Sequence, residues 1–300
     1  MPTLVTGASG FLGRALCPLL TDAGHAVVGV QRTRPVPPGV QPLLLPAVPD
    51  NGPELAAWIH ESRPARVLHL GSPVNPARDP ALWEEMQTGV LQTTAHIARA
   101  CAATDTPLVL VSTCEVYGDG PAPFHESQRP QPVSPYSAAK AAAELWVSTL
   151  ARTQGLRALI LRPFLAYGPH QERRGLVPAA VRAAVRREPF PMTAGAQTRE
   201  LNHVQDLARG IAMAAESGLW GHTLNLCGGP ELPVLQIVQR IFDLAGADRS
   251  LIMPGALPTR SGEVARFCGD PSLCASLLGY QPRIDLDAGL RACIDAERAA

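Results

Sequence analysis

Apolar and polar positions follow two patterns along the chain, one typical of strands and one typical of helices. Short apolar runs predict buried strands over residues 3–6, 25–30, 41–45, 67–70, 108–111, 156–161 and 223–226. Amphipathic or alanine-rich segments predict helices that end at Gly24 and Gly155, and helices over residues 53–63, 82–103, 176–187, 204–217, 234–245 and 285–299. Strands that alternate with helices predict an α/β fold with a doubly wound parallel sheet. The sequence has no internal repeats.

The composition of the chain narrows the class of partner. With 300 residues and 46% hydrophobic composition, the chain is long enough to bury a sizeable core. Its 26 Lys and Arg residues balance its 26 Asp and Glu residues, and a net charge of zero argues against nucleic acid or an anionic membrane as the main partner. A small-molecule ligand fits this composition better.

Cysteine usage and the start of the chain indicate a compartment. The seven cysteines are odd in number and include no Cys-x-x-Cys pair, so neither a disulfide framework nor a metal site is indicated. The chain enters a strand pattern almost at once, with no basic, apolar leader and no run of 18 apolar residues. We therefore expect a cytoplasmic protein without a signal peptide or a membrane span.

A glycine-rich segment, Gly7-Ala8-Ser9-Gly10-Phe11-Leu12-Gly13, joins the first predicted strand to the first helix. In this context glycines allow a tight turn, a close approach of backbone N–H groups to a pyrophosphate and close packing of the helix, whose N-terminus faces the phosphates. The pattern predicts a dinucleotide site with contacts from Gly7, Ser9, Gly10, Phe11, Leu12 and Gly13. The alternative is a glycine turn that binds no ligand.

This strand, loop and helix predict a Rossmann fold and a division into two domains. An NAD(P)-binding domain is expected over residues 1–165, with residues 203–227 rejoining it through the strand at 223–226. Proline and glycine residues interrupt the pattern after residue 162. A smaller C-terminal α/β domain that binds the substrate is therefore expected over residues 166–300.

The end of the second predicted strand indicates which dinucleotide binds. NAD enzymes usually carry an acid there for the ribose 2′-hydroxyl, whereas this chain has Gln31, Arg32 and Arg34. Arginine matches a 2′-phosphate in charge and geometry, so NADP(H) is favoured over NAD(H). Alternatively, both arginines are solvated loop residues. Val48 is expected to border the adenine.

Three reactive side chains follow the buried strand at 108–111. Thr113, Cys114 and Glu115 fall at the end of that strand, and sites form at the ends of parallel strands. The segment from 118 to 135 is rich in proline, glycine and serine and predicts a loop over the site. His125 and Glu126 within this loop are interpreted as exposed polar residues that take no part in catalysis.

A tyrosine and a lysine follow this loop at helical spacing. Ser134-Pro135 is typical of a helix cap with a first-turn proline, so Tyr136 and Lys140 lie on one face of the next helix. An ammonium close to a phenol favours the phenolate, which would make Tyr136 a base. The spacing by itself also fits a core tyrosine and a solvated lysine.

With these residues in view, the chain resembles the extended short-chain dehydrogenase/reductase family over nearly its whole length, and within it the nucleotide-sugar epimerases, dehydratases and reductases. The motifs that carry the resemblance are Thr6-Gly7-x-x-Gly10-Phe11-x-Gly13, His69-Leu70, Asp79-Pro80, Ser112-Thr113-x-Glu115-Val116-Tyr117-Gly118, Tyr136-x-x-x-Lys140, Leu161-Arg162-Pro163, Tyr167-Gly168-Pro169 and Arg199 before Glu200. The tail looks most similar to GDP-mannose 4,6-dehydratases and GDP-4-keto-6-deoxymannose reductases, which use NADP(H). Its matching segments are Arg260-Ser261-Gly262-Glu263-Val264, Gly269-Asp270-Pro271 and Leu278-Gly279-Tyr280-Gln281-Pro282.

The resemblance implies a catalytic role for three residues. Thr113 would hydrogen-bond the reacting sugar hydroxyl, and Tyr136 would be the base. Lys140 would hold the nicotinamide ribose and lower the pKa of the tyrosine.

The resemblance also implies residues that bind rather than react. Arg199 and Arg260 would bind the diphosphate of a nucleotide-diphosphate sugar. Leu70 and Pro163 are expected to contact the cofactor, and Ser72 is expected to contact the substrate.

Some positions depart from the pattern of the family. Cys114 stands where the dehydratases usually have Asp or Ser, and Gly89 stands where Asn is common. The usual Arg-Asp-Phe triplet reads Arg199-Glu200-Leu201, and the chain is closer in length to the reductases than to the GDP-mannose dehydratases.

These residues favour an enzyme that oxidises C4 of a nucleotide-diphosphate hexose through bound NADP+ and returns the hydride after elimination or epimerisation. Glu115 supports this function, because a carboxylate beside a C4 ketone can remove the acidified proton of a neighbouring carbon. Cys114, a thiol that is mostly protonated at pH 7, would then protonate a leaving C6 hydroxyl. Alternatively, Cys114 is a small packed residue and Glu115 only hydrogen-bonds the sugar.

Two other functions remain as alternatives. The first is an NADPH-dependent 4-keto-6-deoxyhexose reductase, which fits the chain length and Arg32. The second is a non-catalytic NADP sensor on the same fold, which would not need Thr113, Tyr136 and Lys140 together.

The helix after Ser134 predicts a homodimer. Between Ser137 and Leu150 apolar residues surround most of its circumference, and such a helix must be buried on both sides. One side can pack on the sheet, and the other would meet the same helix and the 82–103 helix of a second subunit. Alternatively, the C-terminal segment of the same chain covers it.

Overall fold

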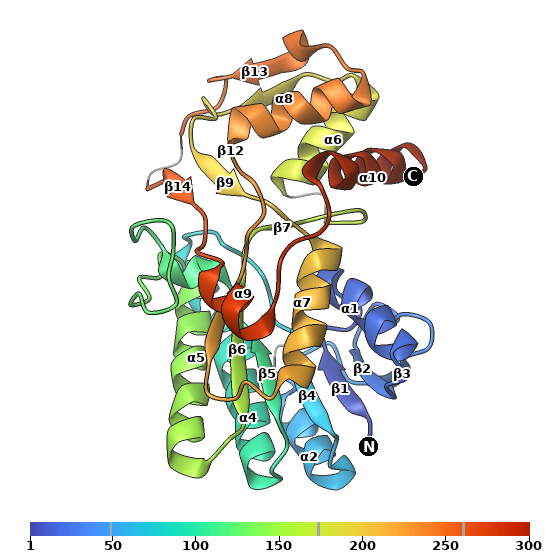
Figure 1. Cartoon of the computed structure of the whole chain (residues 1–300), viewed down its shortest axis with the longest axis vertical. Coiled ribbons are helices and arrows are strands. Elements are labelled where there is room, and N and C mark those ends of the chain that lie inside the picture. The colour runs from blue at the N-terminus through green and yellow to red at the C-terminus, as the bar shows by residue number, and fades with distance from the viewer. Residues whose placement is uncertain (49, 173–174, 260–261) are drawn as a thin grey trace.

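The computed structural model describes residues 1–48, 50–172, 175–259 and 262–300, and it has two halves (Figure 1). In the lower half of Figure 1 a sheet lies among helices, and over the described residues this sheet has seven strands in the order β11-β6-β5-β4-β1-β2-β3. The strands are β1 (Thr3–Thr6), β2 (Val27–Gln31), β3 (Gln41–Leu44), β4 (Arg66–His69), β5 (Leu108–Val111), β6 (Ala158–Pro163) and β11 (Thr223–Leu226). All neighbouring pairs are parallel, which confirms the predicted Rossmann type of sheet.

Each strand of this sheet contributes to two cores, because successive side chains point to opposite faces. Leu4 packs on one face and Val5 on the other, and Leu108 and Val109 divide in the same way. One face is covered by α1 (Phe11–Asp22) and α7 (Val204–Ser217), and the other by α2 (Gly52–Ser62), α4 (Thr93–Ala103) and α5 (Pro135–Gln154). Burial on both faces explains why the strands are continuous apolar runs in the sequence.

The predicted helix over residues 82–103 is not one continuous α-helix. The structure has a 3₁₀ turn (Pro80–Leu82), α3 (Trp83–Met86), a π-helical turn (Gln87–Gln92) and then α4. The π-helical turn contains Gly89, a weak helix former, and the side chains that follow it make other contacts: the Thr93 hydroxyl donates to the Asp50 carboxylate (2.8 Å), and the Thr94 hydroxyl donates to the Val90 carbonyl (2.6 Å). Hydrophobic spacing does not report such hydroxyl contacts, so the sequence pattern misses the break.

The upper half in Figure 1 is built around three helices, α6 (Leu176–Arg186), α8 (Val234–Ala245) and α10 (Leu286–Arg298). Their apolar faces share one core. Around them lie the short strands β7 (Ala166–Tyr167), β8 (Phe190–Met192), β9 (Thr198–Glu200), β10 (Asn202–His203), β12 (Glu231–Pro233), β13 (Ile252–Pro254) and β14 (Arg266–Phe267), whereas α9 (Ser272–Leu278) lies in the lower half and packs Cys274 into the core of the sheet. The sequence predicts the three core helices but not these strands, since two or three residues are too few to show an alternating pattern.

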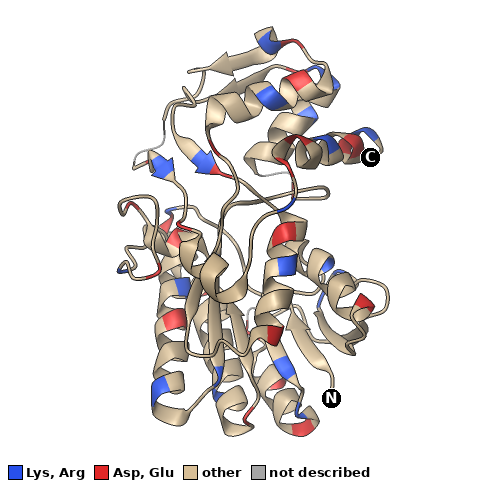
Figure 2. Cartoon of the chain, viewed as in Figure 1, with Lys and Arg blue, Asp and Glu red and all other residues tan. Residues whose placement is uncertain are grey.

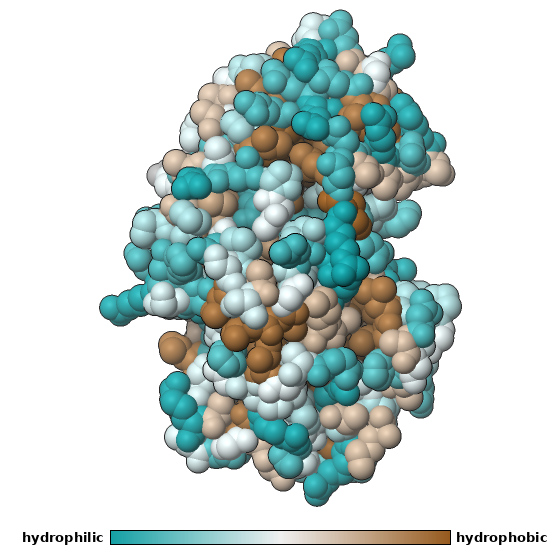
Figure 3. All heavy atoms as spheres, in the orientation of Figure 1, coloured by the Kyte–Doolittle hydropathy of each residue, from teal (hydrophilic) through white to brown (hydrophobic). Residues whose placement is uncertain are grey.

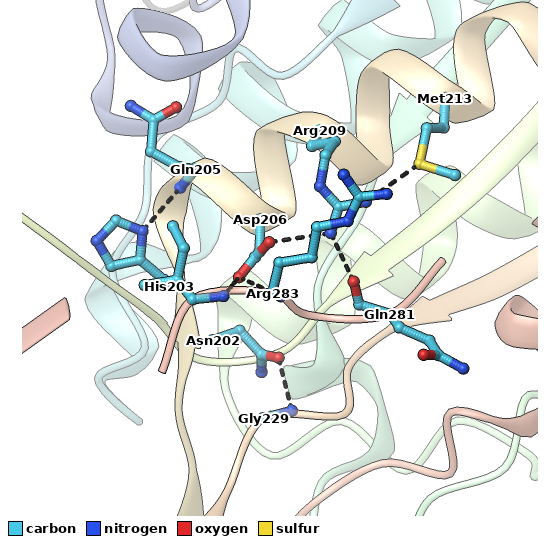
Figure 4. A network of polar contacts seen from close by, with 10 residues as sticks. Asn202, His203, Gln205, Asp206, Arg209, Met213, Gly229, Gln281 and Arg283 are labelled. Carbon is cyan, nitrogen blue, oxygen red and sulfur yellow. Dashed lines mark hydrogen bonds and ion pairs between the residues drawn. The ribbon is translucent and has the colours of Figure 1, made fainter. Parts of the chain in front are cut away.

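A buried carboxylate ties the two halves together where α7 begins (Figure 4). Asp206 is 2% exposed and accepts hydrogen bonds from the backbone N–H groups of Arg283 (3.0 Å) and Ile284 (2.9 Å). It is also ion-paired with Arg209 (2.9 Å), whose guanidinium donates to the Gln281 carbonyl (2.5 Å). These contacts fix the segment that leads into α10 against α7, and with it the upper half against the sheet.

Charged and apolar side chains are spread over the surface of both halves. In Figure 2 basic and acidic residues are interspersed, in keeping with the net charge of zero. Figure 3 shows an apolar patch beside α9, where Leu273 and Leu277 are 36% and 39% exposed. In the part of the chain that the structure describes, none of the helices has the length and apolarity needed to cross a membrane.

Gly13→Ala should destabilise the packing of α1 on the glycine-rich segment. A Cβ at this position would overlap the Gly7 carbonyl oxygen and lie 2.7 Å from Ala8 Cα. Overpacking of this kind costs about 1–3 kcal/mol, so the thermal midpoint should fall by several degrees. Gly175→Ala is the matched control, because Gly175 has a φ of −83° and a Cβ there would make only ordinary contacts, the nearest at 3.4 Å. Equal midpoints for Gly13→Ala and the wild type in scanning calorimetry would contradict this packing.

Candidate active site

The carboxyl end of β5 carries the reactive segment that begins at Thr113. The sheet ladder continues through Ser112, whose N–H donates to the Leu161 carbonyl of β6 (2.7 Å). Thr113 then caps a 3₁₀ turn (Cys114–Tyr117), and its Oγ1 accepts a hydrogen bond from the Glu115 N–H (3.2 Å). The cap turns the chain sharply at the edge of the sheet, so that Thr113 and Glu115 stay beside the site.

The start of α5 brings Tyr136 and Lys140 to the same place. Ser134 and Ser137 cap the helix reciprocally, since the Ser134 Oγ accepts from the Ser137 N–H (3.1 Å) and the Ser137 Oγ accepts from the Ser134 N–H (3.0 Å). The cap fixes where the helix begins, which places Tyr136 and Lys140 one turn apart on a buried face. Tyr136 is 6% exposed, Lys140 is 3% exposed, and a hydrogen bond links the Tyr136 phenol to Thr113.

Burial dominates the protonation of the Tyr136 and Lys140 pair. It raises the pKa of Tyr136 above its usual range, and the hydrogen bond with Thr113 opposes that rise. Burial also lowers the pKa of Lys140 to about 8, against an upward effect of Glu144. The Lys140 ammonium donates to the Val111 carbonyl (3.0 Å) and lies 6.0 Å from the centre of the Tyr136 ring. Burial of the phenol therefore sets the direction of the shift in this structure, and the pKa of Tyr136 is raised rather than lowered.

Glu115 lies among charged side chains from other segments. Burial raises its pKa, and the positive charges of Arg199 and Arg78 act in the opposite direction. Arg199, on β9, is ion-paired with Glu263. The structure thus brings Arg199 to Glu115, whereas Arg260, the second residue expected at the diphosphate, lies outside the described residues.

The residue after Arg199 holds β9 in place. Glu200 is 2% exposed, and its carboxylate accepts hydrogen bonds from the N–H groups of Gly228 (2.6 Å) and Gly269 (2.8 Å) and from the Asn202 amide (2.9 Å). Three segments converge on one carboxylate, which explains why an acid stands at the second position of this triplet. Glu200 therefore positions Arg199 rather than reacting.

Cys114 is buried below Thr113. It is 2% exposed and belongs to an apolar cluster with Phe164 and Cys227. Burial raises the pKa of the thiol, and the negative charges of Glu115 and Glu200 raise it further. The thiol keeps its proton at neutral pH but is a weaker acid than an exposed cysteine, and its burial also fits the alternative role of a packed residue.

The glycine-rich segment fits the pyrophosphate of a dinucleotide. Gly7 has a φ of +71°, and a Cβ there would lie 2.8 Å from the Gly71 nitrogen, so the ends of β1 and β4 meet with no side chain between them. Helix α1 begins after Gly10, and within the described chain no side chain caps its N-terminus, which leaves the first N–H groups for an anion. Ser9 is half-buried at this entrance, as are Phe11 and Leu12.

The other expected binding residues lie near the carboxyl ends of the strands. Leu70 and Ser72 follow β4 and Pro163 ends β6, and all three are half-buried. Arg32 follows β2 and donates to the Val48 carbonyl (3.4 Å). The two residues expected at the adenosine end of the cofactor therefore lie together.

A buried polar network behind Tyr136 and Lys140 escaped the sequence analysis. Arg162 on β6 is ion-paired with Glu144 on α5 (2.6 Å) and donates to the Tyr117 hydroxyl (2.9 Å). That hydroxyl donates in turn to the Asn225 side chain on β11 (2.7 Å). The available signals were the motif positions of Tyr117 and Arg162 and the four-residue spacing between Lys140 and Glu144.

The interpretation of His125 and Glu126 as exposed loop polarity is wrong for Glu126. This side chain is half-buried and accepts a hydrogen bond from the Asn225 N–H (2.7 Å), while His125 lies 3.1 Å from Asp270. The loop after Gly118 is thereby pinned to β11 and to the segment that leads into α9.

Comparison with known proteins identifies the family. The model of the NAD-dependent epimerase/dehydratase family matches residues 3–227. The chain belongs to this family. The match confirms the resemblance to the extended short-chain dehydrogenase/reductases and makes the chain a member of a family of enzymes.

Two curated relatives of this epimerase/dehydratase family member and one solved structure match it over nearly their whole length. A dTDP-glucose 4,6-dehydratase of Streptomyces antibioticus is 30% identical over an alignment of 319 residues, which covers 98% of this chain and 92% of that protein. A GDP-6-deoxy-D-mannose reductase of Pseudomonas aeruginosa is 29% identical, with 97% and 95% covered. The crystal structure of a dTDP-glucose 4,6-dehydratase from Streptomyces venezuelae, which has NAD bound, matches with a TM-score of 0.88 and 26% identity over 100% of this chain and 97% of that chain.

Lys140→Met should cut the turnover of this epimerase/dehydratase family member at least about 100-fold without destabilising it. A buried lysine whose pKa is lowered to about 8 costs stability at neutral pH, because the unfolded chain holds the proton more readily. This cost is fully present below the folded pKa and is relieved as the pH rises toward the unfolded value of about 10.4. The thermal midpoint of the variant at pH 7 should equal or exceed that of the wild type, and its advantage should shrink by pH 10. A clearly lower midpoint at pH 7 would contradict the assignment.

Proposed function

We propose that this protein is a nucleotide-sugar dehydratase or epimerase that transiently oxidises C4 of a nucleotide-diphosphate hexose. The observation that carries the proposal is the position of Glu115, a half-buried carboxylate with a raised pKa two residues after Thr113. A raised pKa makes a carboxylate a stronger base near neutral pH. A simple reductase would have no use for such a base.

The residues around the glycine-rich segment fit NAD(P), and the solved relative from Streptomyces venezuelae has NAD bound. The segment from Gly7 to Gly13 and the N-terminus of α1 would hold the pyrophosphate, and Lys140 would hold the nicotinamide ribose. When bound, the cofactor supplies the oxidant for C4 and later the reductant that restores it.

The side chains of this chain would then move protons at defined carbons. Tyr136 would take the proton of the C4 hydroxyl, and Thr113, which is hydrogen-bonded to the phenol, would align that hydroxyl. Because burial raises the pKa of Tyr136, the phenolate requires positive charge nearby, and Lys140 supplies part of it. Once C4 is a ketone, the C5 proton is acidified and Glu115 would remove it. Arg199 would bind the diphosphate by exchanging its contact with Glu263 for one with phosphate.

Within this proposal, the role of Cys114 depends on whether the enzyme is a dehydratase or an epimerase. Dehydration needs a proton on the leaving C6 hydroxyl, and the protonated Cys114 thiol beside Glu115 is the candidate donor. Epimerisation at C5 needs only a proton returned to C5, so Cys114 would then serve packing alone. The 30% identity with the dTDP-glucose 4,6-dehydratase of Streptomyces antibioticus favours dehydration.

A second function, reduction of a nucleotide-linked 4-keto-6-deoxyhexose, is favoured by one comparison. The GDP-6-deoxy-D-mannose reductase of Pseudomonas aeruginosa is matched over 97% of this chain. Tyr136 would donate the proton to the C4 oxygen, and Glu115 would only hydrogen-bond the sugar.

Turnover in D2O, with dTDP-glucose as the first substrate, tests the role of Glu115. The wild type should place deuterium on a sugar carbon, because the proton that Glu115 removes exchanges with solvent. Glu115→Gln should slow this exchange about 100-fold or more, the usual scale for loss of a general base. Mass spectrometry of the product reads both results.

Product without carbon-bound deuterium would refute proton removal by Glu115 and support the reductase. Cys114→Ala is the companion variant. Slower elimination with intact exchange would assign the thiol to proton donation, and unchanged turnover would assign it to packing.

We also propose that the cofactor is NADP(H) rather than NAD(H). The support is Arg32, which lies at the end of β2 in place of an acid. Arg32→Ala should weaken NADP(H) binding about tenfold or more and leave NAD(H) binding nearly unchanged, because the guanidinium forms charge-assisted hydrogen bonds with a 2′-phosphate. Arg34→Ala is the control, since Arg34 is ion-paired with Glu172 (3.2 Å). Equal affinities of the wild type for both cofactors in calorimetry would contradict the preference.

The exposed face of α5 supports the proposal of a homodimer. Leu145 and Trp146 are 65% and 44% exposed on this helix, and Trp83 on α3 is 52% exposed. The C-terminal helix α10 lies in the other half of the molecule and does not cover them (Figure 1). Trp146→Glu should convert a dimer to a monomer in light scattering, because a charge in a buried apolar contact is costly, whereas Leu273→Glu on α9 should not. A monomeric wild type at micromolar concentration would contradict the proposal.

A further inference from the structure

Lys140 is the single lysine in the 300-residue sequence. All the other residues among its 26 Lys and Arg are arginines. It is also buried, with 3% of its surface exposed. An arginine cannot replace such a group, because a lysine ammonium is a compact charge whose protonation responds to its surroundings. What surrounds Lys140 therefore decides whether it is charged at the pH at which the enzyme works.

The groups that face Lys140 come from several elements. The Val111 carbonyl of β5 accepts its hydrogen bond at 3.0 Å, and the Tyr136 ring lies one turn earlier on α5. His69 of β4 stays neutral, because burial lowers its pKa to about 3. Glu144 follows Lys140 by one helical turn, so the two side chains share a face of α5. Glu144 is thus the negative group that acts on the lysine, and its effect is to raise the pKa of Lys140.

The neutral state of His69 is built into a chain of hydrogen bonds. The Thr94 hydroxyl donates to the Val90 carbonyl (2.6 Å), so its oxygen is free to accept from Nε2 of His69, which lies 3.1 Å away. On the other side of the ring, Nδ1 of His69 lies 2.7 Å from the Thr6 hydroxyl oxygen. This arrangement gives His69 a hydrogen on Nε2 and an acceptor at Nδ1. His69 therefore provides no charge that could take over the role of Glu144.

Glu144 is held by Arg162 in a bidentate ion pair. Both side chains are 6% exposed, and the guanidinium reaches the carboxylate at 3.1, 3.2 and 2.6 Å. A buried ion pair of this kind adds little net stability, because desolvation of both charges offsets their attraction. Its position one turn from Lys140 points to a role in charge placement instead.

The far side of Arg162 meets neutral groups. One nitrogen donates to the Tyr117 hydroxyl (2.9 Å), and the guanidinium carbon lies 4.8 Å from the centre of the Tyr117 ring. The Tyr117 hydroxyl donates to Asn225 Oδ1 (2.7 Å), and the Asn225 amide donates to the Phe124 carbonyl (2.9 Å). These contacts orient Arg162, and its ion-pair partner Glu144 stands one helical turn from Lys140 on α5.

We propose that the buried Glu144–Arg162 pair is a positioning element of the active site, in which Glu144 keeps Lys140 charged beneath the reacting sugar and Arg162 fixes the direction of that carboxylate. The proposal rests on the proposed function, in which Tyr136 must become a phenolate beside a charged Lys140. If Glu144 were neutral, its upward effect on the pKa of Lys140 would be lost, and burial would favour the uncharged amine.

The single lysine allows a direct test without any substrate. Enzyme labelled with ¹³C-lysine gives one side-chain Cε signal in NMR, and its shift follows the protonation of Lys140 with pH. Relative to the wild type, Glu144→Gln should lower the titration midpoint by about one pH unit or more, and Arg162→Met should raise it. The double variant should titrate between Glu144→Gln and the wild type, because both charges leave together. Glu61→Gln on the exposed side of α2 removes the same charge elsewhere and should leave the midpoint unchanged.

An unchanged midpoint in folded Glu144→Gln would overturn the proposal. If a single variant does not fold, the double variant decides, because paired removal of buried charges is tolerated better than removal of one partner. A midpoint in the double variant at or above that of the wild type would also overturn it.

The kinetic counterpart of the titration is the alkaline limb of the pH profile of kcat/KM with a nucleotide sugar. It should move to lower pH in Glu144→Gln by the same amount as the lysine midpoint, which a purely structural role of Glu144 would not produce. Lack of turnover with every nucleotide sugar would refute the proposed function, while the lysine titration would still decide whether Glu144 controls Lys140.

Discussion

The burial of a lysine ammonium between α5 and the end of β5 is the constraint on which the rest of this structure depends. The buried Lys140 ammonium loses its hydration and donates a hydrogen bond to one backbone carbonyl, that of Val111. Burial lowers its pKa to about 8. Such a group costs stability and persists only where the surroundings fix it. The cap at the start of α5 and the Glu144–Arg162 pair meet that need, because the cap sets the position of the lysine on the helix and the Glu144 carboxylate, held by Arg162, lies one turn away.

The same edge of the sheet gathers the other parts of the site. The ends of β1 and β4 meet at Gly7 and Gly71 without side chains between them, next to the N-terminus of α1. The upper half reaches this edge through β9, which Glu200 holds to the segments at Gly228 and Gly269. The backbone is fixed on the cofactor side, at Gly7 and Gly71, and β9 is fixed on the substrate side by Glu200. This arrangement explains how a nucleotide sugar could be held with C4 at Thr113 and Tyr136.

The sequence predicts the parts of this site that depend on local spacing. Strands buried on both faces appear as apolar runs, and Thr113, Tyr136 and Lys140 follow from a strand end and a helix cap. Contacts between distant residues left no such pattern, since Tyr117 and Asn225 are 108 positions apart in the chain. The sequence also does not show which of these side chains are buried. The raised pKa of Tyr136 and the hydrogen bond that Glu126 accepts from Asn225 are therefore known only from the folded structure. The π-helical turn was missed because the apolar residues of the 82–103 segment keep a helical spacing across it.

One incubation shows whether these side chains act on a nucleotide-diphosphate hexose through oxidation at C4. The purified enzyme would be mixed with dTDP-, UDP- and GDP-linked hexoses and their 4-keto-6-deoxy derivatives, with and without added NADPH, and the products read by mass spectrometry and sugar NMR. The account predicts loss of one water, or an isomer of unchanged mass, from at least one hexose without consumption of added NADPH. Gain of two hydrogens by a 4-keto sugar alone, or no change in any sugar, would contradict it.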